Sequence, residues 1–210
     1  MSTDKNSLLD LACDERADLA AFLESLTPQD WNAPTLCEKW TVKDVVAHVV
    51  SYEELTTFGL AKRFVKGHLV RANEVGVQEF APMSPQQLID FLRRHLRPQG
   101  LTAAFGGMIG LVDGTIHHQD IRRALRRPRE VPADRLRRIL PLVPNNPRLG
   151  AGRRIRGLRL TATDIDWRHG NGPEVSGTAE ALLLAMTGRR ETVGELSGPG
   201  QSTLAARVAR

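Results

Sequence analysis

The chain has few of the features that mark a secreted, membrane or disulfide-stabilised protein. Only two of its 210 residues, Cys13 and Cys37, are cysteines, and their spacing gives no disulfide framework. No apolar run approaches the roughly 20 residues needed to cross a bilayer. Residues 1–20 lack the basic start and apolar core of a signal peptide. We therefore expect a cytoplasmic protein with no membrane partner.

Aromatic residues and lysines are also scarce, and both shortages bear on possible partners. Aromatic residues make up 5% of the chain, and only five of its 29 basic residues are lysines. Arginines therefore carry the net charge of +5, and they concentrate at Arg122, Arg123, Arg126, Arg127, Arg129, Arg137, Arg138, Arg153, Arg154 and Arg156. Such a run could bind nucleic acid or a small anion, or form a solvated face. Without a nucleic-acid motif or interleaved aromatics, the solvated face is favoured and nucleic acid is not an expected partner.

The hydrophobic residues that are present predict a mainly helical first part of the chain. They make up 41% of the sequence, which is enough to build a buried core. Apolar residues at helical spacing predict helices near residues 6–25, 42–50, 84–95, 106–127 and 134–140. Thr41 is a suitable N-cap because Asp44 follows three residues later, and Ser84 is a suitable N-cap because proline follows it. Residues 52–80 are amphipathic but have few clear boundaries.

The pattern changes after a proline-rich stretch at residues 141–147, which indicates a linker. Alternating apolar and polar residues predict a strand within 156–167, and the turn at 170–172 leads into a second strand near 174–176. An apolar helix is predicted at 178–186.

The order of these elements predicts an α+β protein of two domains. The predicted helical bundle occupies residues 1–142. A small α/β domain occupies residues 150–210. This division agrees with a chain length that fits one large domain with a small appendage.

Three polar residues on the predicted helices have the composition of a metal site. His48 lies on the helix that follows Thr41, while Asp113 and His117 are four residues apart on the long helix and project from one face. Two imidazoles and a carboxylate are the three protein ligands of a catalytic zinc, whose fourth position stays open. Asp113 also interrupts an apolar stretch, where an unpaired carboxylate would be costly to bury and a bound dication would remove the cost.

Each of these ligands also has an interpretation without a metal. His48 alone would more often be a hydrogen-bonded histidine of the core. Asp113 and His117 could be a solvated helix pair worth only about 0.2–0.5 kcal/mol. His118 points about 100° away from His117 and so cannot share the face of Asp113. His117 is therefore the predicted ligand.

Other polar residues near these motifs have open roles. Asp120 could hold a ring nitrogen of His117, or it could cap the basic residues that follow it. Cys37 could be a thiolate or a metal ligand, but a buried structural cysteine beside Trp40 is favoured. The remaining histidines are expected at the surface: His68, His95 and His169.

Three segments of the sequence resemble one known family. The first is Leu36-Cys-Glu-Lys-Trp-Thr-Val-Lys-Asp-Val-Val-Ala-His48, and the second runs from His117 to Leu125. The third comprises Ala162 to Gly177 together with Gly188-Arg189. Together they resemble the mycothiol-dependent maleylpyruvate isomerase family, within the DinB-like metalloenzyme superfamily, and the resemblance covers nearly the whole chain.

The resemblance implies a DinB-like four-helix bundle followed by a small α/β C-terminal domain related to sterol carrier proteins. It implies zinc or another divalent metal as cofactor, with His48, Asp113 and His117 as its ligands. The isomerase is expected to have glutamate where this chain has Asp113. Because aspartate is one methylene shorter, the metal would lie nearer the helix or be held through water.

The resemblance also implies a reaction. Mycothiol would be the thiol cosubstrate, and its zinc-bound thiolate would attack a small electrophile, as in a mycothiol S-transferase or a maleylpyruvate isomerase. The alternative is a catalytically weak metal-binding or regulatory protein of the same fold, for which the shorter Asp113 is the argument. We expect a monomer or a homodimer. The residues that bind the thiol and those with a separate catalytic role are not predicted.

Overall fold

The computed structural model describes residues 7–68 and 71–209 and divides into two compact units, Met1–Arg129 and Glu130–Arg210. The helices of the first unit are α1 (Leu8–Leu23), α2 (Pro28–Trp31), α3 (Val42–Val50), α4 (Thr57–Lys66), α5 (Ala72–Phe80), α6 (Pro85–Arg94) and α7 (Met108–Ala124). In the described part of the chain, no helix is long and apolar enough to cross a membrane.

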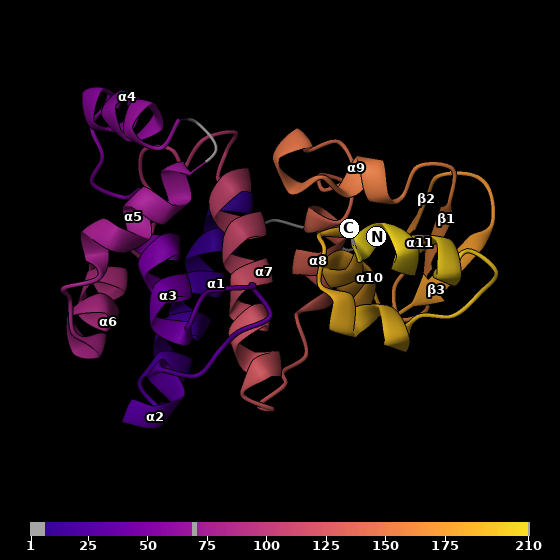
Figure 1. Ribbon diagram of the computed structural model, residues 1–210, viewed down its shortest axis with the longest axis horizontal. Coiled ribbons are helices and arrows are strands. Elements are labelled where there is room, and N and C mark those ends of the chain that lie inside the picture. The colour runs from indigo at the N-terminus through magenta and orange to yellow at the C-terminus, as the bar shows by residue number, and fades with distance from the viewer. Residues whose placement is uncertain (1–6, 69–70, 210) are drawn as a thin grey trace. The chain divides into compact units, whose positions relative to one another are not determined.

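Four of these helices form a bundle (Figure 1). Helix α1 packs against α6 and α7, and α3 packs against the same two helices, so each of the four contacts two others. Their facing sides bury Leu19, Leu23, Val45, Leu88 and Leu92. Helix α5 packs on α3, and α4 packs on α5. The bundle thus brings α3 and α7, the helices of the predicted metal ligands, side by side.

A reciprocal capping box sets the start of four helices in this unit. The N-cap residues are Ser7, Thr27, Thr41 and Ser84. At α3, the Asp44 amide donates to Thr41 Oγ1 at 3.3 Å, and the Thr41 amide donates to the Asp44 carboxylate at 2.9 Å. Both bonds satisfy amides that the first turn of a helix leaves unpaired. The predicted starts of α3 and α6 are confirmed.

The remaining helices of the first unit differ in how well the sequence pattern predicted them. The predicted helix at 6–25 is α1, although its first residue, Asn6, lies outside the described residues. The poorly bounded stretch at 52–80 forms α4 and α5. Helix α2 was not predicted, because four residues are too few to show a helical period.

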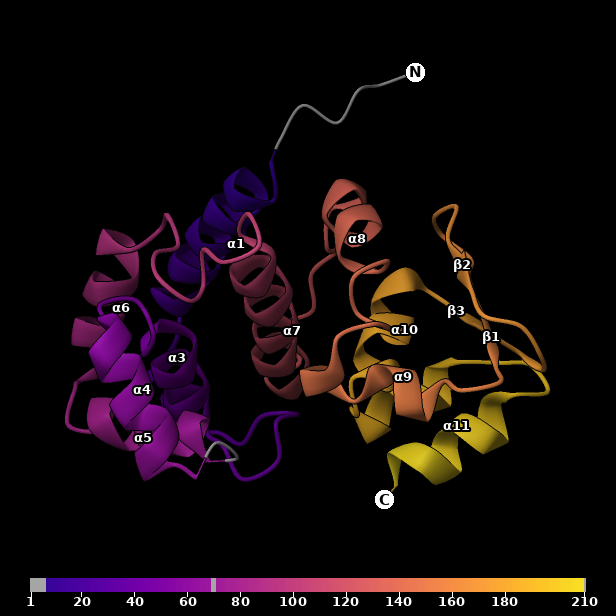
Figure 2. The ribbon, with the colours of Figure 1, turned by 90° about the horizontal axis from the view of Figure 1, so that it is seen from above.

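The second unit contains a small sheet and short helices (Figure 2). Its elements are α8 (Ala133–Ile139), α9 (Ala151–Arg154), β1 (Arg159–Ala162), β2 (Arg168–His169), β3 (Glu174–Gly177), α10 (Ala179–Met186) and α11 (Gln201–Val208), with 3₁₀ turns at Pro147–Leu149 and Arg190–Glu195. Helix α10 packs against β1 and β3 and against α11. The α+β class is confirmed. The boundary between the units precedes α8, whereas the predicted bundle extends to residue 142.

The sheet differs from a simple hairpin. Its order is β2-β1-β3, with β1 antiparallel to β2 and parallel to β3, so the turn at 170–172 joins two strands that do not pair. The turn must pass close to the chain that precedes β1. Gly170 and Gly172 have φ angles of 79° and 128°, and a Cβ there would lie only 2.3 and 2.2 Å from backbone oxygens of that chain. Glycine is therefore needed at both positions.

Candidate metal centre

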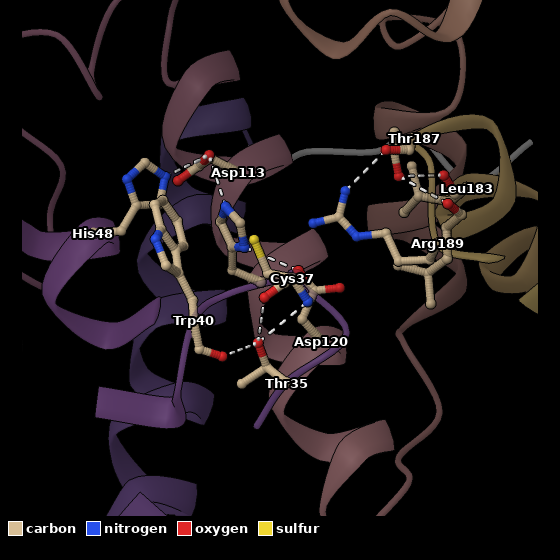
Figure 3. Close-up of polar contacts among 11 residues, drawn as sticks. Thr35, Cys37, Trp40, His48, Asp113, Asp120, Leu183, Thr187 and Arg189 are labelled. Atoms are coloured by element: carbon tan, nitrogen blue, oxygen red, sulfur yellow. Dashed lines mark hydrogen bonds and ion pairs between the residues drawn. The ribbon is translucent and has the colours of Figure 1, made fainter. Parts of the chain in front are cut away.

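The three predicted ligands meet around one carboxylate oxygen. His48 from α3 places Nε2 3.4 Å from Asp113 Oδ1, and His117 from α7 places Nε2 3.5 Å from the same oxygen. The ligand atoms of the three residues all lie within 4.8 Å of one another. Figure 3 shows the imidazole of His48 directed toward the Asp113 carboxylate. Two helices that are distant in sequence therefore aim their donors at one point.

These separations fit a divalent cation. Zinc forms bonds of about 2.0–2.1 Å to nitrogen and oxygen ligands, and a tetrahedral arrangement then separates neighbouring ligand atoms by about 3.3–3.4 Å. The two separations from Asp113 Oδ1, 3.4 and 3.5 Å, lie within about 0.2 Å of this value. Two neutral imidazoles and one carboxylate are also a donor set that zinc prefers.

Ring packing fixes the orientation of His48. Its ring centroid lies 4.9 Å from that of Trp40 and 4.8 Å from that of His117, which it meets edge to face. The side chain is buried, and its Nδ1 has no hydrogen-bond partner among the described residues. Metal-binding histidines are more often oriented by a hydrogen bond from the second ring nitrogen. In His48, contacts with aromatic rings have this role.

A hydrogen bond fixes the orientation of His117. Asp120 Oδ2 lies 3.0 Å from His117 Nδ1, and Asp120 is fully buried. If Nδ1 carries the proton and donates it to this carboxylate, the lone pair of Nε2 faces Asp113, as a metal ligand requires. Of the two interpretations of Asp120, the structure shows the first, in which it holds a ring nitrogen.

The electrostatics of the cluster favour positive charge. Burial acts to raise the pKa of Asp113, but the imidazoles of His48 and His117 outweigh it and hold that pKa well below its ordinary value. Burial acts to lower the pKa of His117, but Asp113 and Asp120 outweigh it and raise that pKa to about 9. The carboxylates therefore stabilise a cation here, whether a proton or a metal ion.

Asp113 is only partly enclosed. Its side chain is 34% exposed, so it lies at the edge of the bundle. The apolar neighbours Leu111, Val112 and Ile116 are buried and turn to the core. The two imidazoles that face Asp113 stabilise its negative charge. Its exposed side leaves room for a further ligand.

His118 lies on a different face of α7, as its angular offset predicts. Glu15 Oε1 is 2.8 Å from His118 Nδ1, and the Arg122 guanidinium donates to His118 Nε2 at 2.8 Å. His118 is fully buried, and burial is the main cause that lowers its pKa to about 4. Arg129 also pairs with Glu15. This histidine is neutral and structural.

Part of the arginine run is structural as well, which corrects the expectation of a solvated face. The guanidinium of Arg122 lies 3.9 Å from the centre of the Phe22 ring. Arg129 is largely buried and donates to Gln119 at 2.9 Å as well as to Glu15. These two arginines hold α7 and the chain that follows it against α1.

Two further expectations about single residues also need correction. His95 was expected at the surface, but it is buried, with Nδ1 2.8 Å from the Phe91 carbonyl oxygen and its ring stacked on Phe91. Cys37 was expected to be a buried structural residue beside Trp40. It is half-buried, and its ligand atom lies within 4.8 Å of ligand atoms of His117 and Asp120. No spacing in the sequence indicates this contact.

His68 is exposed as expected, and His169 is half-buried in β2.

Part of the first unit matches a known protein family. Residues 13–99 match the family described as the mycothiol maleylpyruvate isomerase N-terminal domain. The match lies within the helical unit. The match confirms the resemblance carried by the Leu36–His48 segment. It ends before α7, so it contains His48, while Asp113 and His117 lie beyond it.

Solved structures show the same fold over most of the chain. The crystal structure of the mycothiol-dependent maleylpyruvate isomerase superposes with a TM-score of 0.57 over 92% of each chain, at 13% sequence identity. A histidine-to-alanine variant of that isomerase gives the same values. At this identity the likeness establishes the fold. No curated protein sequence matches the chain.

Proposed function

We propose that this protein is a metal-dependent enzyme that uses mycothiol to attack a small electrophile. The observation that carries the proposal is the convergence of His48, Asp113 and His117 at the spacing of zinc ligands. The family of the N-terminal domain and the name of the isomerase with the same fold support mycothiol as the thiol.

Each residue of the site has a defined task in this proposal. His48, Asp113 and His117 hold the metal, which we propose to be zinc or another divalent ion. When bound, it would favour the thiolate of a coordinated thiol, whose free pKa is about 8.5. Asp120 keeps the Nε2 lone pair of His117 directed at the site, and Trp40 packs against His48. The exposed side of Asp113 is the approach for the thiol.

Two outcomes of the attack define two activities. If the thiol sulfur adds to a conjugated double bond and leaves again after rotation, the product is the cis-trans isomer and the thiol is regenerated. If the carbon–sulfur bond persists, the thiol is consumed and the protein is a mycothiol S-transferase. Both remain within the proposal, and they differ in the fate of the thiol.

Metal analysis joined to a thiol assay tests the proposal. Purified protein supplied with zinc should bind about one ion per chain, and with mycothiol it should convert at least one member of a panel of electrophiles that includes maleylpyruvate. Loss of free thiol identifies transfer, whereas product without thiol loss identifies isomerisation. His48→Ala should lose both metal and turnover. His68→Ala, which changes an exposed histidine, is the matched control.

The shorter carboxylate of Asp113 favours a second candidate, a catalytically weak metal-binding or regulatory protein of the same fold. Asp113→Glu separates the two. If the wild-type protein binds zinc without turnover and the glutamate variant gains turnover, the regulatory candidate is supported. Turnover by the wild-type protein excludes it. Failure to retain zinc in both proteins would remove both candidates.

Three further expectations stay predictions: the cytoplasmic location, the monomer or homodimer, and the relation of the C-terminal domain to sterol carrier proteins. Size-exclusion chromatography with light scattering would determine the oligomeric state.

A further inference from the structure

A second group of metal donors lies behind His117. Cys37, His117 and Asp120 offer ligand atoms that all lie within 4.8 Å of one another. Asp120 faces Nδ1 of the imidazole at 3.0 Å, whereas Asp113 faces Nε2 at 3.5 Å. The two nitrogens point out of the ring in different directions. Two donor groups therefore share one imidazole, and their carboxylates face different nitrogens of it.

The position of Cys37 is built into the fold. Its amide donates to Thr35 Oγ1 at 3.2 Å, and its carbonyl accepts from the Trp40 amide at 3.1 Å. The neighbouring Leu36 amide donates to the Asp120 carbonyl at 3.3 Å, which ties the loop to α7 at the residue that supplies the carboxylate. Figure 3 shows Cys37, Thr35 and Asp120 gathered on one side of Trp40, with His48 on the other.

We propose that Cys37, His117 Nδ1 and Asp120 form a second cation site, selective for thiophilic ions such as Cd²⁺. A thiolate is a soft ligand, and its presence distinguishes this donor set from the two imidazoles and carboxylate around Asp113. Binding releases the proton of the Cys37 thiol to solvent. The cation takes the lone pair of Nδ1. The proton of that nitrogen leaves to solvent when the ring starts doubly protonated, and it passes to Nε2 when the ring starts as the neutral Nδ1–H tautomer, so Nε2 carries a proton in either case. This site does not depend on the substrate of the protein.

The shared imidazole makes the two sites alternatives. A neutral imidazole has one nitrogen with a free lone pair, and the other carries the proton. A cation at Cys37 leaves Nε2 protonated and directed at Asp113, and His117 is then lost as a ligand to the first site. A thiophilic ion thus displaces zinc from the proposed catalytic position without competing for His48 or Asp113.

Cadmium titration of the full chain tests the second site, because a cadmium–thiolate bond absorbs in the near ultraviolet. The wild-type protein and Cys13→Ser should both show this absorption at about one ion per chain. Cys13 is a matched control, since it is the other half-buried cysteine and burial raises the pKa of its thiol. Cys37→Ser should lose the absorption and keep zinc. His48→Ala should lose zinc and keep the absorption.

Further variants distinguish a built site from a reactive thiol. His117→Ala and Asp120→Asn should each weaken cadmium binding by about tenfold or more if their side chains are ligands. Unchanged affinity in both would mean that the thiol binds alone, and the proposal would fail. It would also fail if the absorption persisted in Cys37→Ser. Zinc-loaded wild-type protein should release its zinc as the absorption grows. Simultaneous retention of both metals would overturn the exclusive use of His117, and circular dichroism would verify that each variant is folded.

Discussion

His117 and His118 are neighbours on α7, yet their surroundings differ in nearly every respect. Both are buried, at 7% and 0% exposure. His117 faces Asp113 and Asp120, and its pKa rises to about 9. Burial lowers the pKa of His118 to about 4, because the Glu15 carboxylate that opposes the shift is shared with arginines. Burial alone therefore does not decide the charge of a histidine here.

The two histidines differ in the other partners of the carboxylates that they face. Glu15 already pairs with Arg129, and Arg122 donates to the second nitrogen of His118, so this imidazole is a neutral bridge between fixed partners. His117 donates to Asp120 on one side and presents its other nitrogen to Asp113, which is partly exposed. One side of α7 is thus a closed network that holds the helix. The other is open to a ligand.

The largest effect is expected from removal of the charge at the centre of the closed network. Glu15→Ala leaves Arg129 and His118 without their buried partner and should lower the free energy of unfolding by about 3–5 kcal/mol. Urea denaturation measures this change. Asp14→Asn, which alters the exposed neighbouring carboxylate, should stay within about 0.5 kcal/mol. A loss below about 1 kcal/mol for Glu15→Ala would show that the network does not hold α7.

Substitution of His117 should mainly reduce metal affinity, whereas substitution of His118 should mainly reduce stability. His117→Ala removes a ligand and should weaken zinc binding by more than about 100-fold, since loss of a residue that only supports a ligand costs about 10–100-fold. His118→Ala should keep zinc affinity within about tenfold and instead lower stability, because Glu15 loses a hydrogen bond in the core. Competition with a chelator measures affinity. Equal zinc affinities of the two variants would contradict the assignment of the ligands.

Asp120 should have an intermediate effect. Asp120→Asn keeps the size of the side chain but removes the charge that holds the proton on His117 Nδ1, and zinc affinity should fall by about 10–100-fold. The same competition assay applies, with helical content as the control. Unaltered affinity would mean that Asp120 has no influence on the imidazole.

The pH dependence of the stability of the metal-free protein should have opposite signs for the two histidines. The pKa of His118 is lowered from 6.5 to about 4, so the unfolded chain binds the proton first and stability falls as pH drops between these values. The pKa of His117 is raised to about 9, so its contribution is complete below pH 6.5 and is lost as pH rises through about 9. Thermal melts of His118→Asn and His117→Asn should each lack one of these slopes. A variant that kept both slopes would assign the titration to another group.

Local sequence signals predicted the parts of the fold that local interactions determine. The capping boxes at Thr41 and Ser84 fix the starts of α3 and α6 through contacts three residues apart. The order of the strands was not predictable in this way. The strand order requires Gly170 and Gly172 to pass close to the backbone that precedes β1. This is a contact between segments that are separate in the sequence.

The same distinction applies to the candidate site. The spacing of Asp113 and His117 on one helix face was visible in the sequence, and the resemblance of Leu36–His48 to a known family brought in His48. Glu15 lies 103 residues from the histidine it contacts, so no local pattern could indicate their pairing. The approach of Cys37 to His117 likewise depends on the bond between the Leu36 amide and α7.

The capping box of α3 determines which changes in chain length the site can tolerate. Thr41 and Asp44 define the first turn of the helix, and His48 follows at a fixed number of residues. A residue inserted between Asp44 and His48 would turn the imidazole by about 100° around the helix axis and away from Asp113. A residue inserted before Trp40 would keep Trp40 next to Thr41 and would leave that orientation unchanged. The loop that carries Cys37 is therefore free to vary in length as far as His48 is concerned.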